Sequence, residues 1–171
     1  GKRKEIEVLR RLQLPAHYPE KEYVLLLHGM GRTRFSMRKL ESCLRGHGYE
    51  TINIGYPSTS QTVARIAEDH LDRAVKCCRE DKAGKIHIVT HSLGGIVVRQ
   101  YLQTHSVPAG SRLVMLAPPN SGSEVAEFLK DFFLYRWITG PAGQVIGTDP
   151  ESLPHILKPI AIEVGVIAGD S

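Results

Sequence analysis

The apolar residues of the chain form short runs that alternate with longer amphipathic stretches. The short runs are rich in Val, Ile, Leu and aromatic residues, as expected of strands buried in a sheet, and they cover about residues 23–27, 49–54, 86–89, 112–117 and 161–168. Between them, apolar positions recur at helical spacing over about 33–45, 63–78 and 96–102. This alternation predicts an α/β fold with a mainly parallel sheet and helices on both of its faces.

Turns that carry polar or small residues follow directly from four of the predicted strands. They contain His28-Gly29, Tyr56, Ser92 and Pro118. Because the carboxyl ends of parallel strands meet at one edge of a sheet, these turns are expected to converge there. The agreement of separate turns on one edge indicates a site at that place.

The stretch from Lys85 to Val98 predicts a strand, a tight turn and a helix, with Ser92 on the turn. A serine in this position projects its hydroxyl at the helix N-terminus, where free N–H groups favour developing negative charge. Such a turn needs small residues two before and two after the serine, which here are Thr90 and Gly94. The pattern indicates a nucleophile.

The run Thr90-His91-Ser92-Leu93-Gly94-Gly95 resembles the nucleophile elbow of the α/β-hydrolase superfamily, and in particular of its bacterial lipase and esterase branch, which includes deacylases of lipid anchors. Thr90 stands where the G-x-S-x-G motif has its first glycine. The resemblance covers about residues 22–170. It implies a serine hydrolase that cleaves carboxylic esters, among them lipids, through an acyl-enzyme on Ser92, with no cofactor and no metal.

The same resemblance implies roles for the loop after the first strand, His28-Gly29-Met30-Gly31. The backbone N–H groups of Met30 and Leu93 would form the oxyanion hole. His28, Gly29, His91 and Tyr56 would border the substrate, with His28 as a structural residue of the loop and not as the catalytic base.

Residues 119–159 are expected to form a lid-like or cap-like insertion. A capping box, Ser121 to Glu124, predicts a helix to about Trp137 whose apolar residues occupy more than one stripe. Phe132 and Phe133 would then line an acyl-binding pocket. An ordinary core helix packed on the sheet explains the same pattern, and the sequence leaves both interpretations open.

The general base is the missing part of the predicted site. After Ser92 the histidines are His105, at the end of the elbow helix, and His155, before the last predicted strand. Neither is well placed, and Asp170 is a weak candidate for the acid. The acid and the histidine are therefore expected beyond Ser171. A noncatalytic interaction module of the same fold, or a fragment completed by another chain, is the alternative.

Composition predicts a single soluble domain, residues 1–171, with a lead-in over 1–21. The 171 residues are 42% hydrophobic and 23% charged. The net charge of +4 arises in residues 1–50, which hold 11 Lys and Arg against 6 Asp and Glu. The basic clusters at Lys2-Arg3-Lys4 and Arg10-Arg11 favour a solvated segment, with peripheral contact with anionic membrane lipid as the alternative.

Other partner classes have no support in the sequence. It contains no nucleic-acid-binding motif, and its three cysteines, Cys43, Cys77 and Cys78, do not have metal-ligand spacing. No signal peptide is apparent, so cytoplasmic, periplasmic and secreted locations are not distinguished. Oligomeric state is not indicated either.

Overall fold

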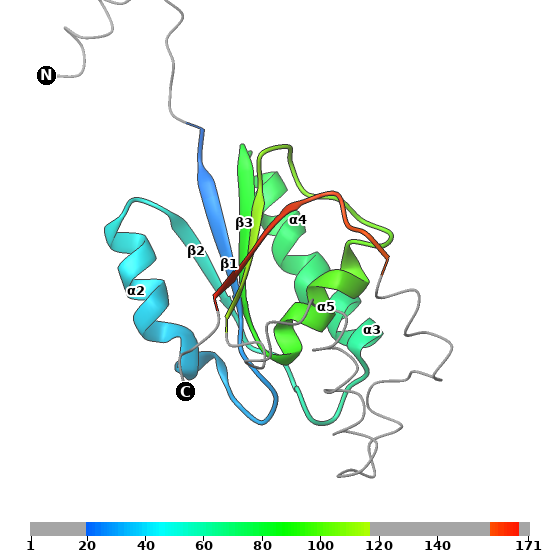
Figure 1. The fold of residues 1–171 in the computed structure, drawn as a ribbon. Helices are drawn as coiled ribbons and strands as arrows, with labels where there is room; N and C mark the ends of the chain where they lie inside the picture. The colour runs from blue at the N-terminus through cyan, green and yellow to red at the C-terminus, as the bar shows by residue number, and fades with distance from the viewer. Residues whose placement is uncertain (1–19, 117–157, 168–171) are drawn as a thin grey trace, which may run out of the picture.

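The computed structural model describes residues 20–116 and 158–167, which form a parallel five-stranded sheet with helices on both faces (Figure 1). The predicted fold class is thereby confirmed. The strands lie side by side in the order β2-β1-β3-β4-β5. Their bounds are β1 Glu22–Leu27, β2 Glu50–Ile54, β3 Lys85–His91, β4 Arg112–Leu116 and β5 Glu163–Ile167.

The helices form two layers, one on each face of the sheet. On one face lies α2 (Arg38–Gly46), which follows the short 3-10 turn η1 (Arg34–Met37). The other face is covered by α3 (Val63–Ile66), η2 (Ala67–Leu71), α4 (Asp72–Glu80) and α5 (Leu93–Tyr101) (Figure 1). The first three of these are consecutive, because the helix predicted over 63–78 widens into one π-type turn at η2.

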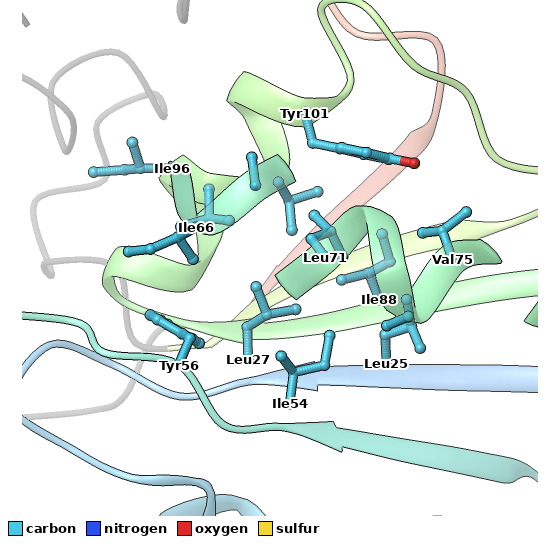
Figure 2. Packing of buried hydrophobic residues seen from close by; sticks show 14 of the residues in the cluster. Leu25, Leu27, Ile54, Tyr56, Ile66, Leu71, Val75, Ile88, Ile96 and Tyr101 are labelled. Atoms are coloured by element: carbon cyan, nitrogen blue, oxygen red, sulfur yellow. The ribbon is translucent and has the colours of Figure 1, made fainter. Parts of the chain in front are cut away.

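Strand β1 packs against both helix layers. Leu25 and Leu27 point into the larger core, which α3, η2, α4 and α5 complete (Figure 2). Val24 and Leu26 point the other way, into a smaller core that includes Met37. All four of these side chains are buried, which explains why residues 24–27 form an uninterrupted apolar run instead of an alternating one.

Strand register aligns the carboxyl ends of the three adjacent strands. Leu27, the last residue of β1, pairs with Ile54 at the end of β2 and with Thr90 near the end of β3. The turns that follow these strands therefore begin at the same level along the strand direction. This register places the His28 loop, the Tyr56 turn and Ser92 along one edge of the sheet.

Several predicted features lie outside the described residues. These are residues 1–19 of the lead-in and the apolar helix expected over 123–137, which includes Phe132 and Phe133. His155 and Asp170 also lie outside the described residues. The lid-like insertion over 119–159 and the single domain over 1–171 also remain predictions.

Candidate functional site

Ser92 joins β3 to α5 in a single strained residue. Its backbone has φ 51° and ψ −114°, a left-handed φ that non-glycine residues seldom adopt, and α5 begins at the next residue. Such a conformation costs about 1–3 kcal/mol and persists only where the surrounding structure imposes it. The geometry is that of the sharp strand-to-helix turn in which a nucleophilic serine is exposed at the helix N-terminus.

The first turn of α5 lies directly against the end of β1. A Cβ atom at Gly94 would meet the Leu27 Cβ atom at 2.8 Å and the Leu27 carbonyl oxygen at 2.9 Å. No side chain fits there without moving the β1 backbone, so glycine is required. Thr90, which replaces the first glycine of the usual motif, is buried, and its Cβ atom would lie 3.2 Å from the same added Cβ. The threonine thus occupies space that Gly94 leaves vacant.

The glycine loop after β1 packs on the elbow. A Cβ atom at Gly29 would lie 2.5 Å from His91 Nδ1 and 3.4 Å from Ser92 Cβ, so only glycine permits this approach. Met30 is the next residue of the loop and packs partly against the larger core, while Leu93 is buried at the start of α5. The two segments predicted to supply the oxyanion hole are therefore neighbours of Ser92. Their roles in catalysis stay predictions.

A buried network from the turn after β2 fastens this loop. The Tyr56 hydroxyl donates to the His28 carbonyl oxygen, and the two rings stack with their centroids 4.1 Å apart. The Ser58 hydroxyl accepts from the Gly31 N–H at 3.0 Å. Sequence analysis missed Ser58, although its place in a turn beside the predicted site was a usable signal. Burial raises the pKa of Tyr56, so its hydroxyl keeps its proton and remains a donor.

Both ring nitrogens of His28 are occupied. Nε2 accepts from the Tyr56 N–H at 3.4 Å, which leaves Nδ1 to donate to the Gly29 carbonyl oxygen at 2.8 Å. This arrangement defines one neutral tautomer. His28 is 1% exposed, and its hydrogen bonds are to the backbone of Gly29 and Tyr56. Contact of His28 or Tyr56 with a substrate stays a prediction.

His91 is half-buried beside Ser92 and Gly29. Burial is the main cause that lowers the pKa of this imidazole below its ordinary value, and the charge of Arg32 lowers it further. The side chain is consequently neutral at neutral pH. Because His91 is uncharged, the positive electrostatic potential around Ser92 comes from the N-terminus of α5 and from Arg32.

In the described part of the chain, no histidine is hydrogen-bonded to Ser92. His105 stacks on Tyr101 with ring centroids 4.3 Å apart and has its Nε2 3.8 Å from Asp72 Oδ1. These contacts lie at the far end of α5, whose nine residues span about 14 Å. The structure thus agrees with the expectation that His105 is poorly placed to act as the base.

Two properties concern residues 20–116 and 158–167 alone. Within these ranges, no group of three or more His, Cys, Asp or Glu residues could hold a metal ion. None of the helices there has the length and apolar character needed to cross a membrane.

A parallel sheet whose central strand ends in a strained serine, with a glycine loop packed on that serine, defines a protein of the α/β-hydrolase class. The chain belongs to the alpha/beta hydrolase family, whose model matches residues 24–163. Membership of the narrower lipase branch is not shown by this match. No protein in the curated set is significantly similar to the chain.

The chain is similar to several solved structures at low sequence identity. A putative thioesterase from Silicibacter sp. TM1040 has a TM-score of 0.56 and 18% identity, over 89% of this chain and 59% of its own. A structure of carboxylesterases from Nitrososphaera gargenis has a TM-score of 0.45 and 19% identity, over 80% and 57%. A lipase-esterase related protein from Clostridium acetobutylicum has 0.49 and 17%, over 86% and 74%.

The chain covers only part of the length of the solved structures that it matches. It spans 51%, 59% and 57% of the first three solved structures that it matches. At such identities the similarity concerns the fold alone. The thioesterase structure from Silicibacter, with a TM-score of 0.56, supports the shared fold.

Replacing Gly94 by alanine should destabilise the protein by about 1–3 kcal/mol, because the new methyl group overlaps the backbone of β1. Gly95→Ala is the matched control. Its methyl group would come closest to the Met115 Cε atom, at 2.3 Å, which is the end of a flexible side chain, and would lie at an ordinary contact distance of 3.4 Å from Thr90 Oγ1, so a smaller loss is expected. Urea denaturation monitored by circular dichroism measures both losses. Equal losses would show that contact with Leu27 does not determine the glycine at position 94.

The lowered pKa of His91 predicts a pH-dependent stability. The unfolded state binds a proton at this residue at higher pH than the folded state does, so stability is greatest above the ordinary histidine pKa and falls as the pH drops through it. His91→Gln should therefore lose less stability than the wild type between pH 7.5 and pH 5. Urea denaturation at the two pH values tests this, and identical losses in both proteins would contradict it.

Proposed function

We propose that the protein is a serine hydrolase that cleaves carboxylic esters, with lipids or other acyl esters as substrates and an acyl-enzyme formed on Ser92. The observation that carries the proposal is the left-handed Ser92 between β3 and α5, with the Gly29 loop against it. Strain of this kind concentrates at functional sites. Membership of the alpha/beta hydrolase family supports the same reaction class.

In the proposed reaction, the Ser92 oxygen attacks the carbonyl carbon of the ester while its proton passes to a general base. The tetrahedral oxyanion accepts hydrogen bonds from the Met30 and Leu93 N–H groups, and the N-terminus of α5 stabilises its charge. Collapse breaks the bond to the alcohol, which leaves with the proton. Water then attacks the acyl-enzyme, the carboxylic acid departs and the Ser92 hydroxyl is restored.

The roles around Ser92 follow from proximity. Gly29 and His91 border the serine, so both would face the acyl carbonyl group. His28 and Tyr56 would act by holding the oxyanion loop, since their polar groups are bonded to that loop and both residues are buried. Phe132 and Phe133 as acyl-pocket residues, and Asp170 as the acid, rest on the sequence pattern alone.

A noncatalytic module with the same fold is the second candidate. It is favoured by one observation, that no histidine of the described residues is bonded to Ser92. A serine without an adjacent base is a poor nucleophile even beside a well-formed oxyanion hole. Covalent labelling and turnover therefore separate the two functions.

Treatment with a fluorophosphonate should label Ser92, because the probe reacts with serines that a base and an oxyanion hole activate. Mass spectrometry of peptides locates the adduct, and hydrolysis of p-nitrophenyl esters measures turnover. The 171-residue chain should be assayed beside the full product of its gene. Ser92→Ala should lose the label and at least about 10³-fold in kcat.

The exposed Ser106 provides a control, since Ser106→Ala should keep both label and turnover. Labelling of a residue other than Ser92 would contradict the assignment of the nucleophile. Absence of both label and turnover in the full gene product would favour the noncatalytic module.

Tyr56→Phe should lower kcat about fivefold with KM changed less than about twofold, because one net hydrogen bond to the oxyanion loop is worth about 1 kcal/mol. Its hydroxyl bonds to the His28 carbonyl oxygen, so its loss loosens the loop without removing a substrate contact. Steady-state kinetics on a p-nitrophenyl ester give both constants.

Tyr101→Phe is the matched control for this change. Its buried hydroxyl donates to Asp72 at 3.0 Å, at the end of α5 remote from Ser92. It should lose stability and keep kcat. A fall in kcat of the same size in both variants would show that the Tyr56 effect is a general loss of stability.

A further inference from the structure

A basic surface with one apolar residue at its centre lies beside the candidate site. The five residues of this surface, here named the Phe35 patch, are all exposed, and they are Arg32, Arg34, Phe35, Arg38 and Lys39. Phe35 is 63% exposed, while the other large apolar side chains that are strongly exposed in the described ranges belong to β5.

The positive charge of the Phe35 patch has no ion-pair partner among residues 20–116 and 158–167. Residues 28–40 contain four Lys and Arg and no Asp or Glu. Within the described ranges none of these four cations forms an ion pair. Glu41, the next acidic residue, is paired with Arg45 at 3.1 Å and accepts from Asn53 at 3.0 Å. The charge is therefore available to an anionic partner.

The Phe35 patch combines an open surface with adjacent charged and apolar groups. Four of its residues line an open hollow of about 790 Å³ together with Gly31, Thr33 and Ser36, and these four are Arg32, Phe35, Arg38 and Lys39. The Arg34 guanidinium lies 5.6 Å from the centroid of the Phe35 ring, so charge and apolar surface are adjacent. Such a mixture matches the boundary between phospholipid headgroups and acyl chains.

The patch lies at the same edge of the sheet as Ser92. It occupies the segment between the carboxyl end of β1 and the first turn of α2 (Figure 1). Arg32 is near enough to His91 for its charge to lower the pKa of that residue. A surface that contacts the patch would consequently also face the rim of the site.

We propose that the Phe35 patch docks the protein on membranes rich in anionic phospholipid. Its four cations contact the headgroups, and the Phe35 ring enters the interface below them. The exposed ring favours a bilayer over a nucleic acid, because a phosphate backbone attracts the cations but offers no apolar layer for Phe35. Docking brings the carboxyl edge of the sheet to the lipid surface, where esters of long acyl chains reside.

Vesicle co-sedimentation tests the proposal without measuring hydrolysis, so Ser92→Ala protein serves throughout. Binding is expected to vesicles of phosphatidylcholine with 30% phosphatidylglycerol, and not to phosphatidylcholine alone. The double variant Arg34→Gln/Arg38→Gln should bind about 25-fold more weakly, since each cation near an anionic surface raises the membrane affinity about fivefold. The matched control is Arg73→Gln/Lys82→Gln, two exposed cations on or just after α4, which should bind like the parent.

Substitution of Phe35 tests insertion into the bilayer. Phe35→Ala should weaken vesicle binding and leave binding to soluble heparin unchanged. Phe35→Trp should show a blue shift of its added fluorescence with anionic vesicles, and quenching by brominated lipid. Thermal melts check that each variant is folded.

Three results would overturn the proposal. Undiminished vesicle binding by Arg34→Gln/Arg38→Gln would place the contact elsewhere, for instance at the basic clusters of residues 2–11. Equal binding to neutral vesicles would remove the role of charge. An unchanged vesicle affinity in Phe35→Ala, or stronger binding to heparin than to anionic vesicles, would identify a polyanion as the partner.

Discussion

The contact between the first turn of α5 and the end of β1 is the constraint on which the candidate site depends. Gly94 lies so close to Leu27 that residue 94 has no room for a side chain. This approach forces the chain to turn from β3 into α5 within one residue, Ser92, which takes a left-handed φ. The strain of about 1–3 kcal/mol is offset by apolar burial along α5, where Ile96 and Val97 are fully buried and each contributes about 1.5–3 kcal/mol.

The same edge of the sheet is stiffened by bonds between turns that are distant in sequence. Tyr56 and Ser58 from the turn after β2 hold the glycine loop that follows β1, and that loop contacts His91 and Ser92 at the end of β3. Three strand ends are thereby coupled. Oxyanion stabilisation requires donors that are already oriented before the reaction begins, so this coupling is what a rigid oxyanion hole needs.

The described groups at this edge of the sheet produce a positive electrostatic potential. The N-terminus of α5 and the cations of the Phe35 patch supply positive potential, while burial keeps His91 uncharged. Positive potential beside Ser92 favours both a developing oxyanion and the approach of anionic surfaces. A hydrolase that works at a lipid interface would use both effects.

The sequence by itself determined the parallel α/β sheet, the order of its elements and the serine turn. Strand runs, helical stripes and small residues around Ser92 are local patterns, and residues close in sequence are enough to produce them. Tertiary structure decided the rest. The tautomer of His28, which depends on the Tyr56 N–H, and the bond between the Gly31 N–H and Ser58 both depend on strand register. Those contacts join residues far apart in the chain, so no local pattern specifies them.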